Sequence, residues 1–140
     1  MFKPTRDQAR GFFFDAWQKH KAAQPLTPLE AMALETMIAH PEYHALLDNP
    51  ERHLARDYAP ESGEINPFLH LQLHLAVAEQ LSIDQPHGIR AHYQRLLAKN
   101  GDDAAAQHAL MECLAEMIWQ AQRSGTGPDA AVYLECLERR

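Results

Sequence analysis

The sequence predicts an all-α fold, a compact helical bundle of about five to seven helices with mostly antiparallel neighbours. Three observations support this prediction. Several segments carry apolar residues at helical spacing and begin at a capping residue or a proline. No stretch shows the sustained apolar and polar alternation, rich in Val, Ile and Thr, that is typical of strands. Connections between the helical segments are short, which favours antiparallel packing.

The first two helices are expected over residues 5–21 and 27–40. Both open on a capping-box pattern, and the second has the clearer start. Thr27 stands at the N-cap, Pro28 at the first helical position and Glu30 three residues after the cap. The capping role also explains the acidic residue on an otherwise apolar face, so metal binding by Glu30 is disfavoured.

Prolines interrupt the next segment. Because Pro41 disfavours helical geometry at the residue before it, residues 41–48 are expected to form a new short helix or a kinked continuation. A short helix is expected over residues 51–57, after a turn at residues 49–50. Residues 58–64, which include a proline and a glycine, are expected to form a loop.

The rest of the chain predicts further helices over residues 66–82, 86–100 and 102–123, and a terminal helix around residues 132–137. Asn66 and Pro67 mark the start of the first of these helices. Gly101 is expected to end the helix over residues 86–100, and Asp102 is expected to cap the helix over residues 102–123.

Length and composition indicate a single domain over residues 1–140. The chain has 140 residues, of which 46% are hydrophobic and 23% charged, so it resembles an ordinary globular domain. The formal net charge of −6 gives no general attraction to nucleic acid or to anionic lipid, and neither is expected as a partner. A protein partner or a homodimer is left open.

We expect a cytoplasmic location. Residues 1–10 are charged and lack the apolar region of a secretory signal, and the most apolar stretch, residues 68–78, is too short and too polar to span a membrane. Cys113 and Cys136 are too few and too widely spaced for a disulfide framework or a zinc motif. We therefore expect them to be free thiols that pack in the interior.

Histidines are the unusual feature, with nine in the chain. His70 and His74 are separated by one helical turn and lie on an apolar face. Buried imidazoles need partners, and two at this spacing can each offer one nitrogen to a metal ion. The opposing interpretation, hydrogen-bonded core histidines, has about equal weight for this pair.

Two further pairs have the same spacing. His40 and His44 are less certain to share a helical face, because Pro41 lies between them. His108 and Glu112 lie on a stripe that is otherwise polar, so solvent exposure is the favoured interpretation there. If helices bearing all three pairs meet, the ligand set suits zinc, iron, copper or manganese, with zinc or iron preferred.

Several catalytic motifs are absent. The sequence contains no His-Glu-x-x-His, Gly-x-Ser-x-Gly, P-loop or Gly-x-Gly-x-x-Gly motif, and no Glu-x-x-His of the ferritin-like kind. Haemerythrin-like proteins use His-x-x-x-His and His-x-x-x-Glu, which this chain shares as spacings only. Neither a reaction nor a substrate follows from these patterns.

Five runs resemble a bacterial family known only as a domain of unknown function, of the DUF1841 type. They are residues 17–21, 25–30, 40–44, 66–74 and 121–125, and the resemblance spans nearly the whole chain. It implies a single small cytoplasmic domain and carries no established activity.

The leading hypothesis is a helical bundle that binds a transition metal through His70 and His74, with His40 and His44 next and His108 and Glu112 as completing ligands. The alternative is a non-enzymatic interaction module with structural core histidines and an exposed apolar patch that includes Phe12, Phe13 or Trp119. A third possibility is a pH sensor built on clustered histidines.

Overall fold

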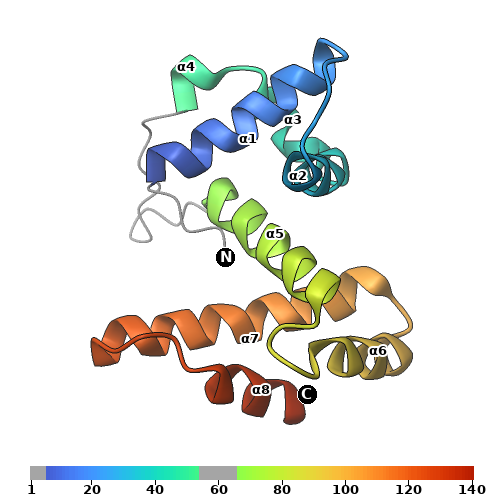
Figure 1. Cartoon of the computed structure of the whole chain (residues 1–140), viewed down its shortest axis with the longest axis vertical. Helices are drawn as coiled ribbons and strands as arrows, with labels where there is room; N and C mark the ends of the chain where they lie inside the picture. The colour runs from blue at the N-terminus through green and yellow to red at the C-terminus, as the bar shows by residue number, and fades with distance from the viewer. Residues whose placement is uncertain (1–5, 54–65) are drawn as a thin grey trace. The chain divides into compact units, whose positions relative to one another are not determined.

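The computed structural model describes residues 6–53 and 66–140 (Figure 1). All regular structure in these ranges is helical and none is a strand, which confirms the all-α prediction. Within the same ranges, no helix combines the length and the apolar character that crossing a membrane requires. The chain divides into two compact units, Met1–Leu75 and Ala76–Arg140, which are described separately. The expectation of one domain over residues 1–140 stays a prediction.

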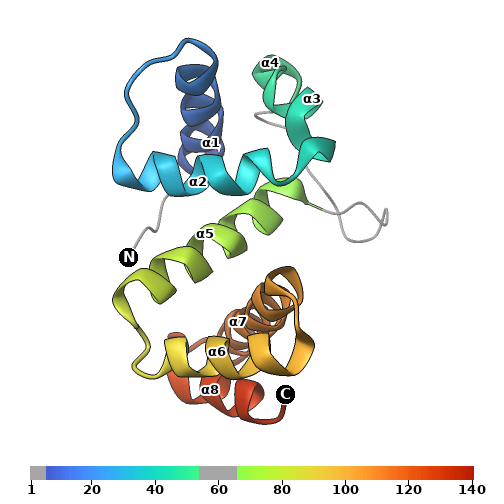
Figure 2. The same ribbon diagram turned by 90° about the vertical axis from the view of Figure 1, so that its right-hand side faces the viewer.

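The first unit contains the short and medium helices before α5 (Pro67–Ile83), together with the first half of α5 itself. They are α1 (Arg6–Lys21), α2 (Pro28–Ile38), the 3₁₀ turn η1 (Pro41–Tyr43), α3 (His44–Leu47), α4 (Pro50–His53) and the first half of α5 (Pro67–Ile83). Helix α1 packs against α2 and α3. Figure 2 shows α2 lying across α1.

The capping box predicted for α2 is confirmed. The Thr27 hydroxyl accepts from the Glu30 backbone N–H at 3.2 Å, and the Glu30 carboxylate accepts from the Thr27 backbone N–H at 2.9 Å. Helix α2 ends at Ile38, two residues earlier than predicted, and Ala39 is its C-cap. The capping residue predicted for the first helix, Thr5, lies outside the described residues.

The proline-rich segment folds as short turns of helix. Pro41 lies after the end of α2 and opens η1, which α3 continues to Leu47, so the first of the two alternatives predicted for residues 41–48, a new short helix, is the one observed. Of the short helix predicted for residues 51–57, the described part is α4, Pro50–His53, and the remainder lies outside the described residues. The loop predicted for residues 58–64 lies outside the described residues.

Aromatic and aliphatic side chains from α1, α2, α3 and α5 form the core of the first unit. They are Phe13, Phe14, Ala16, Trp17, Ala33, Met37, Leu47, Phe68, Leu71 and Leu75. Phe14 and Phe68 meet edge to face, with ring centroids 5.6 Å apart. This core fixes the C-terminal end of α2 and the first turns of α5 in the same unit.

The second unit consists of the end of α5 with α6 (Ile89–Asn100), α7 (Asp103–Ser124) and α8 (Ala130–Glu138). Helix α7 packs against both α6 and α8. The prediction that α6 begins at residue 86 is wrong by three residues. Gly88, with φ of 94°, adopts a left-handed conformation that ordinary residues avoid, so the helix starts only after it.

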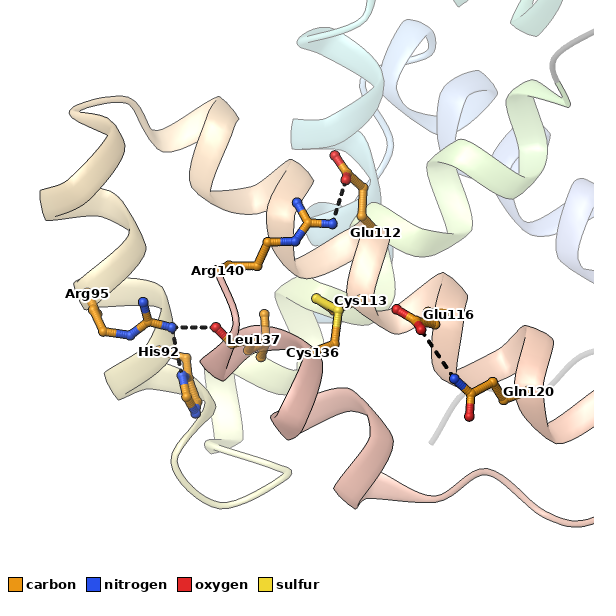
Figure 3. Close-up of a disulfide and its surroundings, with 9 residues drawn as sticks. All are labelled: His92, Arg95, Glu112, Cys113, Glu116, Gln120, Cys136, Leu137 and Arg140. Atoms are coloured by element: carbon orange, nitrogen blue, oxygen red, sulfur yellow. Dashed lines mark hydrogen bonds and ion pairs between the residues drawn. A yellow bond between two sulfur atoms is a disulfide. The ribbon is translucent and has the colours of Figure 1, made fainter.

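A disulfide between Cys113 of α7 and Cys136 of α8 contradicts the expectation of free thiols (Figure 3). The two residues are 23 positions apart in sequence, but their Cα atoms are only 5.6 Å apart, within the normal range for a disulfide. Both are buried, as predicted for packing residues. The wide sequence spacing wrongly predicted free thiols, because α8 runs back along α7 and brings the two cysteines together.

Candidate metal centre

Helix α5 supplies two of the site histidines. The Asn66 side chain accepts from the backbone N–H groups of Phe68 and Leu69, at 3.0 and 3.3 Å, and Pro67 occupies the first turn. This start fixes the helical register that follows. His70 and His74 therefore lie one turn apart on one face, with their ring centroids 4.8 Å apart.

His40 comes from the C-terminal end of α2. The following proline keeps it out of the helix, with φ of −121° and ψ of 72°. From that position the ring turns back on α2, and its Nδ1 lies 2.7 Å from the Thr36 carbonyl oxygen. That oxygen belongs to the last turn of the helix, where backbone acceptors lack helical partners. The ring of His40 is thereby held in a defined orientation.

The Nε2 atoms of these three histidines converge. Nε2 of His70 lies 3.2 Å from Nε2 of His40 and 3.2 Å from Nε2 of His74. The three ligand atoms all lie within 4.8 Å of one another. Among the described residues, these three histidines form the group whose ligand atoms lie close enough together to hold a metal ion, and all three belong to the first unit. We call it the three-histidine cluster.

Counting protons shows that the two Nε2 contacts of His70 are not both hydrogen bonds. A carbonyl oxygen only accepts, so Nδ1 of His40 carries a proton, and Nε2 of the neutral ring carries a lone pair. Each Nε2 has a single in-plane site, which is either an N–H or a lone pair. If Nε2 of His70 is protonated it donates to one neighbour only, and if it is not, it faces the lone pair of His40. Neutral rings therefore make at most one of the two 3.2 Å contacts a hydrogen bond.

A metal ion would use all three lone pairs at once. Zn–N bonds of 2.0–2.1 Å in a tetrahedron place ligand nitrogens about 3.3 Å apart. The two contacts of 3.2 Å are close to that separation. The carbonyl bonded to Nδ1 of His40 is also the kind of outer partner that fixes the tautomer of a metal-binding imidazole.

The cluster has a graded environment. His74 is buried, with 7% of its surface exposed, whereas His40 and His70 are partly exposed. Tyr43 stacks on His40 with centroids 5.6 Å apart and planes 6° apart, and meets the edge of His70 at 6.0 Å. The half-buried Tyr43 ring thus restrains two of the three histidines.

His44 has a different environment from His40. Its Nε2 donates to the Met37 carbonyl oxygen at 2.8 Å, and its ring lies 4.7 Å from that of Trp17. Because a carbonyl only accepts, this Nε2 carries its proton and is not available to a metal. His44 is not a member of the three-histidine cluster, and its predicted metal ligation stays a prediction.

The remaining predicted ligands belong to the second unit. His108 is exposed, and Glu112 is exposed and paired with Arg140 at 2.8 Å (Figure 3). Neither is a member of the cluster, and their metal ligation also stays a prediction. In the first unit, the hydrogen bond from the Thr27 backbone N–H at 2.9 Å and the ion pair with Lys19 at 2.9 Å lower the pKa of the Glu30 carboxyl group.

Sequence reasoning missed two contributors to the cluster. Tyr43 was not considered, although its position three residues after His40 places it in the turn that follows. The backbone carbonyl of Thr36 has no side-chain signal, but a histidine placed directly before a proline at a helix end is a sign of such a back-bonded ring.

Comparison with known proteins identifies one family. The family model described as Domain of unknown function (DUF1841) matches residues 5–139. No curated protein and no solved structure matches the chain. The family resemblance predicted from the sequence is therefore confirmed, and it brings no activity with it.

Proposed function

We propose that this chain, which belongs to the DUF1841 family, binds a divalent transition-metal ion through Nε2 of His40, His70 and His74. The observation that carries the proposal is the contact of one Nε2 with two others at 3.2 Å, where His40 already has its proton on Nδ1. Three Nε2 atoms within 4.8 Å of one another, of which the two contacts of His70 are not both hydrogen bonds, favour a metal site over a hydrogen-bond chain.

The donor set narrows the choice of ion. Imidazole nitrogen suits zinc, copper, iron and nickel, whereas magnesium and calcium prefer oxygen ligands. Among the described residues no carboxylate or thiolate joins the cluster. We therefore infer zinc or iron as the first ions to test, and we assign no reaction to the site.

The alternative is an interaction module whose histidines are structural. Its support is the capping of the α2 end by His40 and His44, which needs no metal. The apolar patch predicted for this module is reduced, because Phe13 is buried and Phe12 partly buried. Trp119 remains, 55% exposed, with the Arg123 guanidinium over its ring.

The test is elemental analysis of the untagged full chain, purified without chelator and then reconstituted with zinc or with iron(II) under anaerobic conditions. We expect close to one ion per chain, and loss of that ion in the His70→Ala/His74→Ala variant. His87→Ala is the matched control, because its side chain is 96% exposed and lies in the second unit. It should retain the parent metal content.

Thermal unfolding with and without chelator gives an independent readout. A metal that binds only the folded chain at a hundred times its dissociation constant stabilises it by about 2.7 kcal/mol. A parent protein that takes up neither ion, while remaining folded and unaffected by chelator, would move the assignment to the interaction module.

A further inference from the structure

We infer that the metal ion of the three-histidine cluster takes a small anion from solution as an additional ligand. The inference rests on the proposed metal site and concerns what that site binds. Three features carry it: the number of protein donors, their charge, and the exposure of the rings.

The number of donors is low for the ions that imidazole favours. Zinc takes four ligands in its usual tetrahedral sites, and sites with three protein ligands keep a position for water or substrate. The cluster offers three nitrogens, two from one face of α5 and one from the end of α2. At least one coordination position is therefore left for a ligand from outside the described residues.

The donors are also uncharged. Nδ1 of His40 donates its proton in a hydrogen bond to the Thr36 carbonyl oxygen, so Nε2 offers an uncharged lone pair, and an imidazole that coordinates a metal is neutral in general. Among the described residues no carboxylate belongs to the cluster: Glu30 binds Lys19, and Asp48 accepts from Trp17 and from Lys21 at 2.8 and 2.7 Å. A divalent ion held by three neutral nitrogens keeps its full charge of +2.

A full double charge is costly in a partly buried site, because the surroundings solvate it less well than water does. An anionic ligand halves the net charge and is favoured over a neutral one for that reason. His40 and His70 are partly exposed, so these two rings are in contact with solvent. Hydroxide, carboxylates and other small anions with one coordinating atom share the required chemistry.

The experiment uses the full chain loaded with Co²⁺, whose visible absorption reports its ligands, and sodium azide as the anionic probe. Sodium perchlorate at equal ionic strength is the non-coordinating control. We expect a saturable change in the visible bands with azide and none with perchlorate. The His87→Ala variant should respond as the parent does, and the His70→Ala/His74→Ala variant should show neither the bands nor the response.

The outcomes separate the two proposals. Stoichiometric Co²⁺ binding with no azide response would overturn the anion site and leave the metal site intact. Failure of the folded parent to bind Co²⁺, zinc or iron would overturn both. A response to azide that persists in the double histidine variant would also overturn the inference, because the anion would then bind away from the cluster.

Discussion

Breaking the Cys113–Cys136 disulfide should destabilise the second unit strongly. The bond joins α7 to α8, and both cysteines are buried between them (Figure 3). Replacing both by alanine removes the link without placing a hydroxyl in the interior. The double variant Cys113→Ala/Cys136→Ala is therefore the perturbation to use, beside the parent protein in reduced form.

The size of the effect follows from the loop that the bond closes. A cross-link restricts the unfolded chain more as the loop between its ends grows. For the observed sequence separation of 23 residues, the chain-entropy relation gives about 3.4 kcal/mol at room temperature. With ordinary urea dependence, this corresponds to a fall of roughly 1 to 3 M in the unfolding midpoint.

The assay is urea unfolding followed by far-ultraviolet circular dichroism, with thiols counted by a chromogenic reagent under denaturing conditions. We expect no free thiol in the parent before reduction and two afterwards. The reduced parent and the double variant should both unfold at lower urea. Equal midpoints for oxidised and reduced protein, or two reactive thiols without reduction, would refute the reasoning.

Three further predictions concern the caps and the interior. Because folding lowers the pKa of Glu30, its ionised carboxylate stabilises the folded chain above pH 4.5, and this stabilisation is lost as the pH falls below 4.5. The urea midpoint of the parent should therefore fall as the pH is lowered from above to below 4.5, and that of Glu30→Gln should fall less. Thr27→Ala removes the capping hydroxyl of α2 and should cost about 1 kcal/mol in urea unfolding, whereas a cost near zero would contradict the cap. Tyr133→Phe removes the buried hydroxyl that donates to Gln80 at 2.7 Å and should cost about 1 to 2 kcal/mol; a more stable variant would show that this bond is unimportant.

Most helices could be predicted because their boundaries are local. Thr27 with Glu30, and Asp102, are signals that act within one turn, and the structure confirms them. The start of α6 was missed because Pro86 also suits a turn, and Gly88 adopts a left-handed conformation before the helix begins. The disulfide depends on where two helices meet, and that information is not local.

The candidate site was predictable in part for the same reason. His70 and His74 follow from helical periodicity alone, and the structure places their Nε2 atoms 3.2 Å apart. The place of His40 beside them depends on how the end of α2 packs against α5, which spacing does not encode. Pro41 weakened the argument for a His40 and His44 pair, and the structure gives the two rings different partners.

The contrast between His40 and His44 shows how a backbone carbonyl determines which ring nitrogen carries the proton. Both rings donate to carbonyl oxygens at the end of α2, so both have one nitrogen committed to a proton. His40 commits Nδ1 and directs the lone pair of Nε2 at His70, whereas His44 commits Nε2 and packs its ring on Trp17. Histidine spacing therefore identifies candidate rings, but the carbonyl that each ring meets decides which nitrogen remains for a metal. In the proposed metal site, that criterion selects Nε2 of His40 as the third ligand beside the pair on α5, whereas Nε2 of His44 bonds the Met37 carbonyl at the end of α2.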